Sequence, residues 1–244
     1  MKRAGNAVEC PREMKTKRKK TVLFDIDGTL VDTGGKGREA FIRGLERATG
    51  VRDELAYVSF AGNTDRNVLD QVMAARGLRL AEQDVRRTFA MIAEELRELL
   101  GEHPAREIQG ASAFLARLAK ENTALGLVTG NIRECADLKL KSAGLDRFFG
   151  FGGFGDIHAE RAKIARSALA AAKEAGVAVE EGWVCLVGDT PFDVAAGKAL
   201  GIPVIGVATG KYGEETLRES GATITVANYS DIDWLLEMME TGFK

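Results

Sequence analysis

The feature that most constrains the fold is an alternation of short apolar runs with helical patterns. Residues 21–24, Thr-Val-Leu-Phe, lie between a charged segment and an Asp-x-Asp-Gly sequence, which is typical of a buried strand. Similar runs recur at 124–128, 183–187, 204–207 and, more weakly, 223–226. Because the runs are apolar throughout rather than alternating, we predict an α/β fold with a parallel sheet covered by helices on both faces.

Residues 36–106 differ in kind, because they contain helical patterns and no convincing strand. Apolar residues recur at helical spacing over 68–73 and 85–99, and a third helical pattern covers 36–49. We therefore predict an all-helical insertion after the first strand. The expected organisation is a basic tail over 1–20, a core formed by 21–35 and 107–244, and a small helical cap over 36–106.

Composition excludes several classes of protein. Hydrophobic residues make up 45% of the 244, which is enough for a packed core and excludes a wholly disordered chain. No run of about 18 uncharged apolar residues occurs, so we expect no transmembrane helix. The cysteines Cys10, Cys135 and Cys185 form no C-x-x-C pair. This argues against a disulfide framework or a structural zinc site and fits a reducing cytoplasm.

The net charge of −2 is unevenly distributed, since residues 1–20 carry eight basic and two acidic side chains. We interpret this tail as a solvated, disordered extension. A tether to nucleic acid or to an anionic surface is the alternative, and the absence of interleaved aromatic residues for base stacking argues against it. A third interpretation is that Met14 is the true start. No apolar stretch follows the basic residues, so a secretory signal is not indicated.

Polar sequences follow three of the predicted strands. They are Asp-Ile-Asp-Gly-Thr at 25–29, Thr-Gly-Asn at 129–131 and Gly-Asp-Thr-Pro-Phe-Asp at 188–193. Ligands of parallel α/β sheets bind beyond the carboxyl ends of the strands, so we expect the three sequences to converge at one edge. Helix capping explains such residues singly, but their order and spacing favour a binding site.

Acidic residues in these sequences predict a metal site. Period-2 alternation directs the Asp25 and Asp27 side chains the same way, Asp189 adds a third carboxylate, and Asp193 is a candidate fourth. Close carboxylates remain ionised at low cost only beside a cation. Hard oxygen ligands without His or Cys suit Mg²⁺ better than zinc. Asp193 has an equally good structural explanation, because Pro191 favours a helix start that places this acid in the first turn.

The Thr129–Gly130 pair lies at a predicted strand-to-helix junction. A hydroxyl and free backbone N–H groups at such a junction form a natural phosphate cradle, although Thr129 also suits a simple helix N-cap. Gly28 permits a tight backbone turn where a substrate approaches closely. These residues therefore predict binding of a phosphate group.

The motifs resemble those of the haloacid dehalogenase superfamily, in its phosphoglycolate phosphatase-like branch. Residues 25–32, Asp-Ile-Asp-Gly-Thr-Leu-Val-Asp, are similar to the first motif of this family. Residues 127–131 resemble the second motif and 188–193 the fourth, and the match covers 21–244 in the family's order. The resemblance implies a Rossmann-like core with a small helical cap inserted after the first strand.

The third motif departs from the family pattern. Family members usually carry a Lys or Arg between the second and fourth motifs, often as Lys-Pro, and this chain has no such Lys-Pro. Within 156–163, Arg161 resembles the arginine form of the motif, with Lys163 as the alternative. Either cation would offset charge between the nucleophile and the phosphate, and an exposed charge on a helix face is the structural explanation of each.

The resemblance implies a Mg²⁺-dependent phosphatase acting on a small phosphorylated metabolite. We expect it in the cytoplasm with no membrane partner, and a nucleic-acid partner is disfavoured. Asp25 would be the nucleophile and Asp27 the general acid and base. The resemblance also implies that the Asp25 and Asp189 carboxylates and the Asp27 backbone carbonyl hold the metal. The implied catalytic residues are Asp25, Asp27, Thr129 and Arg161. The implied phosphate-binding residues are Gly28, Thr129, Gly130, Asn131 and Lys163.

Other functions are also consistent with the motifs. A phosphomutase would share every motif and differ in returning the phosphoryl group to a sugar. A non-catalytic scaffold is less favoured, because Asp25 and Asp27 are both present. The sequence identifies neither the substrate nor the oligomeric state.

We expect loops at residues 62–66 and 150–155. Residues 62–66, Gly-Asn-Thr-Asp-Arg, form the cap loop that we expect to reach toward the site, with Arg66 either contacting an anionic substrate group or solvated. Residues 150–155 match G-x-G-x-x-G literally but lack the strand and helix that a dinucleotide fingerprint requires. We interpret them as a flexible loop.

Overall fold

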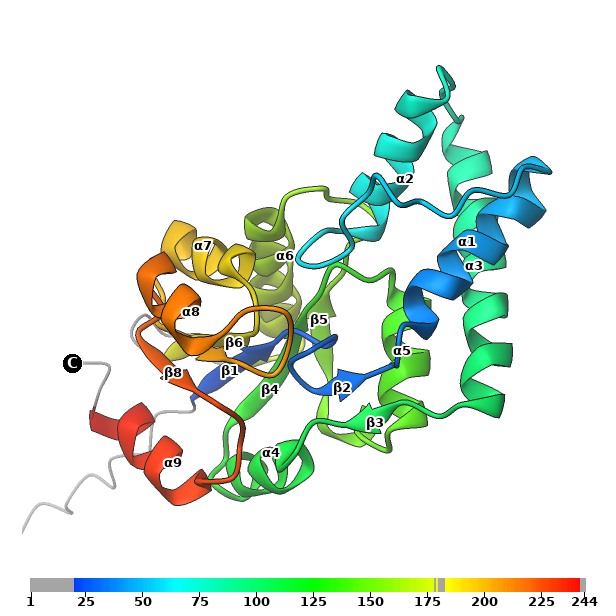
Figure 1. The fold of residues 1–244 in the computed structure, drawn as a ribbon. Coiled ribbons are helices and arrows are strands. Elements are labelled where there is room, and N and C mark those ends of the chain that lie inside the picture. The colour runs from blue at the N-terminus through cyan, green and yellow to red at the C-terminus, as the bar shows by residue number, and fades with distance from the viewer. Residues whose placement is uncertain (1–19, 178, 180–182, 242–244) are drawn as a thin grey trace, which may run out of the picture.

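A computed structural model describes residues 20–177, 179 and 183–241, so the predictions for the basic tail, Met14 and Cys10 lie outside the described residues apart from Lys20. The core is a six-stranded sheet in the order β5-β4-β1-β6-β7-β8, and every adjacent pair is parallel. The predicted α/β, Rossmann-like class is therefore confirmed (Figure 1). The strands are β1 (Thr21–Phe24), β4 (Ala124–Val128), β5 (Phe151–Gly153), β6 (Val184–Gly188), β7 (Val204–Val207) and β8 (Ile224–Val226).

Helices connect the strands and cover the sheet. None of the described helices is long and apolar enough to cross a membrane. The helices are α1 (Lys36–Thr49), α2 (Asp65–Ala75), α3 (Glu82–Glu102), α4 (Ala111–Lys120), α5 (Arg133–Ser142), α6 (Arg161–Glu174), α7 (Pro191–Leu200), α8 (Glu214–Ser220) and α9 (Ile232–Thr241), with a 3₁₀ turn at Asp146–Phe148.

The central strand β1 buries side chains on both faces of the sheet. Val22 and Phe24 belong to one apolar cluster, with residues of α4, α5 and α9. Leu23 belongs to the other cluster, with residues of α6, α7 and α8. Successive side chains of a strand point to opposite faces, so a continuous apolar run in the sequence supplies both layers of the core.

Helices α1, α2 and α3 form the insertion that follows β1 (Figure 1). The short strands β2 (Val31–Asp32) and β3 (Arg106–Glu107) pair in antiparallel fashion where the chain leaves and re-enters the core. Apolar side chains of α1 and α3, including Phe41 and Leu96, join the same cluster as Val22 and Phe24. The inserted helices therefore pack onto the core directly, and we retain as a proposal that residues 36–106 act as a cap.

The interpretation of residues 150–155 as a flexible loop was wrong. Phe151–Gly153 form β5, the edge strand that pairs in parallel with β4. Gly126 of β4 faces Phe151 in the register, and the Phe151 ring occupies the space that a side chain at Gly126 would need. Strand β5 therefore depends on β4, because Gly126 has no side chain and leaves room for the Phe151 ring.

Candidate active site

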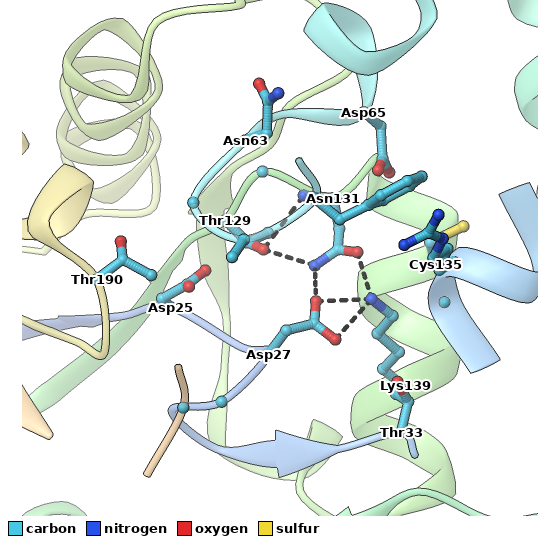
Figure 2. A pocket seen from close by; sticks show the side chains of 18 of the residues that line it. Asp25, Asp27, Thr33, Asn63, Asp65, Thr129, Asn131, Cys135, Lys139 and Thr190 are labelled. Atoms are coloured by element: carbon cyan, nitrogen blue, oxygen red, sulfur yellow. Dashed lines mark hydrogen bonds and ion pairs between the residues drawn. The ribbon is translucent and has the colours of Figure 1, made fainter. Parts of the chain in front are cut away.

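A cavity of about 300 Å³ lies where β1, β4 and β6 end and the inserted helices face the sheet. Its walls include the residues that follow these three strands, so the convergence expected from the sequence is present. Figure 2 shows several of these side chains directed toward one another. The lining contains Asp25, Asp27, Gly28, Thr129, Gly130, Asn131, Arg161 and Asp189 from the predicted site, and Arg38, Phe41, Phe60, Asn63 and Asp65 from the inserted segment.

Three buried carboxylates form the acidic part of the cavity. Oxygen atoms of Asp25, Asp189 and Asp193 lie within 4.8 Å of one another. Burial raises the pKa of Asp25 to about 6, although the charge of Arg161 opposes this shift. Burial, followed by repulsion from Asp25 and Asp193, raises the pKa of Asp189 to about 8. Such a cluster of hard oxygen donors fits a divalent cation, which would relieve the repulsion.

Arg161 is the cation that the structure brings to this cluster. It opens α6, is buried, and places Nη1 3.0 Å from Asp25 Oδ1 and 2.8 Å from Asp193 Oδ1. Burial lowers the pKa of Arg161, but the carboxylates of Asp193 and Asp25 outweigh this effect and raise it. Lys163 lies apart: its half-exposed side chain pairs with Glu160 at 2.6 Å, and it is not among the described residues lining the cavity.

Asp193 has the structural position expected from the sequence. Pro191 opens α7, and Thr190 is its N-cap. The Asp193 carboxylate accepts hydrogen bonds from the Thr190 backbone N–H at 3.1 Å and from the Thr190 hydroxyl at 2.7 Å. The same carboxylate also contacts Arg161, so helix capping and orientation of a cavity cation depend on one side chain.

Gly28 and Thr29 lie next to the Asp189 carboxylate. Gly28 has a φ of +75°, and a Cβ there would lie 2.5 Å from Asp189 Oδ2. The Thr29 hydroxyl donates to Asp189 Oδ1 at 3.0 Å. A side chain at position 28 would therefore collide with the Asp189 carboxylate, so a group of the protein, rather than a substrate, requires glycine here. Thr29 was not expected from the sequence to contact Asp189.

Thr129 is not the N-cap of α5, because Ile132 occupies that position. The Thr129 hydroxyl instead accepts hydrogen bonds from the Asn131 backbone N–H at 3.3 Å and from Asn131 Nδ2 at 2.8 Å. Gly130 lies against the backbone of Asn63, in the inserted segment. The predicted phosphate cradle thus lies between the core and the inserted helices.

Asp27 is held by two side chains on the other side of the cavity (Figure 2). Asn131 Nδ2 donates to Asp27 Oδ2 at 2.7 Å, and Lys139 Nζ lies 2.8 and 2.6 Å from the two carboxylate oxygens. Burial lowers the pKa of Lys139, but the charges of Asp27 and Asp65 outweigh it and raise this pKa. The sequence analysis missed Lys139. The available signal was its spacing, because it falls on the same helix face as buried Cys135, Ala136 and Leu140.

The loop at 62–66 reaches the site as expected. Its backbone joins the core, since Asp65 N donates to Gly130 O at 2.7 Å and the Asp65 carboxylate accepts from Ile132 N at 2.8 Å. Burial raises the pKa of Asp65 to about 6. Arg66 instead directs its side chain toward Asp70 and Glu82 and is not among the described residues lining the cavity, so the structure does not support its contact with a substrate.

A family model and a relative of known name both place this chain among hydrolases of one family. A family model described as haloacid dehalogenase-like hydrolase matches residues 22–207. A phosphoglycolate phosphatase of Rhodospirillum rubrum is 31% identical over 222 residues, which cover 88% of this chain and 90% of that protein.

Solved structures show the same fold. A hydrolase from Pseudomonas syringae has a TM-score of 0.68 and 21% identity, with 91% of this chain and 99% of that chain covered. A Thermotoga maritima protein proposed to be a β-phosphoglucomutase has a TM-score of 0.58 and 24% identity, with 89% and 98% covered. At these identities the structural likeness concerns the fold alone.

Proposed function

Because the chain belongs to the haloacid dehalogenase-like hydrolase family, we propose that it is a Mg²⁺-dependent phosphatase that hydrolyses a small phosphate monoester through an aspartyl-phosphate on Asp25. The observation that carries the proposal is the pairing of two carboxylates in different surroundings at one cavity. Asp25 is buried beside Arg161, whereas Asp27 is held by Asn131 and Lys139 and is 43% exposed. Different surroundings suit different chemical roles.

In the first half of the reaction, an Asp25 carboxylate oxygen attacks phosphorus in line. The bond between phosphorus and the ester oxygen breaks, and Asp27 gives its proton to the departing alkoxide. In the second half, Asp27 takes a proton from a water molecule that attacks the same phosphorus. The Asp25–phosphorus bond then breaks and inorganic phosphate is released. Arg161 and the Thr129 region would hold the phosphoryl oxygens.

The residues present fit a divalent cation near Asp25 and Asp189. The Asp25 and Asp189 carboxylates, with the Asp27 backbone carbonyl, would hold Mg²⁺. When bound, the ion would supply positive charge that offsets the charge developing on the phosphoryl group. Thr29 supports this assignment because its hydroxyl orients the Asp189 carboxylate, and the absence of a side chain at Gly28 leaves room for that carboxylate.

The cavity suits a small phosphorylated metabolite. Its volume is about 300 Å³, and residues of the inserted segment, including Phe41 and Phe60, close part of it. Closure by an inserted cap excludes water and selects the substrate. The relative from Rhodospirillum rubrum makes phosphoglycolate one member of the panel to be tested.

A phosphate-release screen over a panel of phosphorylated metabolites, with and without Mg²⁺, tests the proposal. We expect release that EDTA abolishes and that Asp25→Asn reduces almost to the background. Formation of an isomer in place of free phosphate would instead identify a phosphomutase. An Asp25→Asn protein that keeps its activity, with deamidation excluded by mass spectrometry, would contradict Asp25 as the nucleophile.

A further inference from the structure

Lys139 makes the densest set of polar contacts around Asp27, yet no step above uses it. We propose that Lys139 is a positioning residue: with Asn131, it fixes the Asp27 carboxylate in the orientation from which the leaving oxygen is protonated. The inference rests on the proposed function, because it assigns Asp27 the role of proton donor.

The contacts form a closed ring of three side chains. Lys139 Nζ lies within 2.8 Å of both oxygens of Asp27 and 2.6 Å from Asn131 Oδ1. Asn131 Nδ2 in turn donates to Asp27 Oδ2 at 2.7 Å and to Thr129 Oγ1 at 2.8 Å. Both carboxylate oxygens are therefore engaged, and the carboxylate cannot rotate about its last side-chain bond without breaking a charge-assisted contact.

The position of the ammonium group is fixed by its surroundings. The Lys139 side chain is 5% exposed and lines the cavity. A Cβ at Gly37 of α1 would lie only 3.2 Å from Lys139 Nζ, so the absence of a side chain at Gly37 leaves room for the ammonium. A buried lysine is costly unless charged partners surround it. In this chain the partners are Asp27 and, through its charge, Asp65.

Asp27 itself has the opposite character, because its side chain is 43% exposed. Without the ammonium and amide contacts, several rotamers would be open to it. Precise placement of a proton donor affects only steps in which a proton moves. Removing Lys139 should therefore lower the rate more for a leaving group that needs a proton than for one that does not.

Lys139→Met tests this dependence, and Lys141→Met is the matched control. Lys141 is an exposed lysine of the same helix, with no ion pair within the described part of the chain. Two substrates are compared: the best alkyl phosphate of the screen, whose alkoxide needs protonation, and 4-nitrophenyl phosphate, whose phenolate leaves without it. General acid catalysis contributes about 10²–10⁴-fold. The second half of the reaction uses Asp27 with either substrate, so the comparison is made on kcat/KM, which reports the first half alone. We therefore expect kcat/KM for the alkyl phosphate to fall at least about tenfold more than kcat/KM for the aryl phosphate.

A double-mutant cycle identifies the partner through which Lys139 acts. In an Asp27→Asn background, Lys139→Met should have little further effect on kcat/KM for the alkyl phosphate, because the group that it positions is already lost. Equal losses of kcat/KM on both substrates, or full additivity with Asp27→Asn, would overturn the inference.

Two further measurements keep the outcome interpretable. If Lys139→Met alone fails to fold, Lys139→Met with Asp65→Asn removes a partly buried acid whose charge Lys139 offsets, and the same comparison of substrates is made on that protein. A wild-type protein inactive on both substrates would overturn the proposed function itself, whereas an active wild type whose variant loses kcat/KM equally on both would overturn only the role of Lys139.

Discussion

Asp189 is a carboxylate whose ionisation opposes folding unless a cation is present. Its pKa is raised to about 8, first by burial and then by the charges of Asp25 and Asp193. An acid whose folded pKa exceeds its unfolded value favours folding at low pH. That contribution is complete below the ordinary aspartate pKa of 3.8 and is lost as the pH rises through about 8. A bound divalent ion would reverse this effect by stabilising the ionised form.

Asp189→Asn should therefore remove a pH-dependent penalty from the metal-free protein. In EDTA, we expect the wild type to lose roughly 1–3 kcal/mol of stability relative to the variant as the pH rises from about 6 to 8.5, because one pKa unit corresponds to about 1.4 kcal/mol. Urea denaturation over this pH range measures the difference. Added Mg²⁺ should stabilise the wild type and leave the variant unchanged. Parallel pH profiles in EDTA would contradict the electrostatic account of Asp189.

Arg161 and Lys163 are two cations at the start of α6 with different surroundings. Arg161 is buried against Asp25 and Asp193, whereas Lys163 pairs with Glu160 at the surface. Arg161→Met should lower kcat by about 10²–10³-fold, the range typical of a lost electrostatic contact to the reacting group. Lys163→Met should leave kcat within about twofold of the wild type, since an exposed ion pair contributes little. Steady-state phosphate release measures both.

Folding has to be separated from catalysis in this comparison, because Arg161→Met leaves two buried carboxylates without their cation. Arg161→Lys keeps the charge and is the second variant. A folded Arg161→Met protein with normal kcat, or a Lys163→Met protein with a large loss, would reverse the assignment of the third-motif cation.

The predictability of the site differs from residue to residue. Asp25, Asp27 and Asp189 follow strands within recognisable motifs, so their convergence could be expected from the topology of a parallel sheet. Lys139 lies in Asp-Leu-Lys-Leu-Lys, a sequence equally typical of an exposed helix face. Its burial depends on the packing of α5 against Asp27, which follows β1, and against the start of α1. Helical spacing places Lys139 on the apolar face of α5, but no local pattern in the sequence indicates which groups would meet it there.

At the scale of elements, the contact between α1 and α3 illustrates how packing outweighs helix propensity. Gly44 lies in the buried face of α1, and a Cβ there would lie 2.6 Å from the Ile92 Cα atom of α3. Gly101, near the end of α3, has no atom within 4 Å of such a Cβ. The two glycines are thus in helices but in opposite packing environments.

Gly44→Ala should destabilise the protein and Gly101→Ala should stabilise it. The overpacked contact at Gly44 costs about 1–3 kcal/mol, which exceeds the gain of about 1 kcal/mol from helix propensity. At Gly101 only the gain remains, so we expect a stabilisation of roughly 0.5–1 kcal/mol. Urea denaturation of both variants gives the two signs. A stabilised Gly44→Ala protein would show that the helices separate at little cost.

The elements themselves were predictable to different degrees. The helix over 36–49 was expected with the bounds that α1 has, because its amphipathic period and the glycine at its end are local properties. Strand β5 was missed because two of its three residues are glycines, which have low strand propensity. It forms because β4 offers a partner with Gly126 opposite Phe151, and such pairing is a tertiary property.

At the scale of the whole molecule, the inserted helices and the sheet have one apolar core in common. Leu45 and Leu96 of the insertion belong to the same buried cluster as Phe24 of β1 and Leu140 of α5. The hydrogen bonds from Asp65 to Gly130 and from Ile132 to Asp65 add polar contacts beside the cavity. A cluster that continues across both parts couples their stabilities.

We therefore expect the insertion and the core to unfold in one transition. Trp183 and Trp234, the two tryptophans of the chain, both lie outside residues 36–106, so their fluorescence reports on the core, whereas far-UV circular dichroism also reports on α1, α2 and α3. The two urea curves should coincide, as two-state unfolding requires. Gly44→Ala, a change confined to α1, should then lower the fluorescence midpoint as much as the dichroism midpoint. An early dichroism phase without a fluorescence change would mean that the inserted helices unfold independently, and that their packing against Phe24 contributes little to the stability of the sheet.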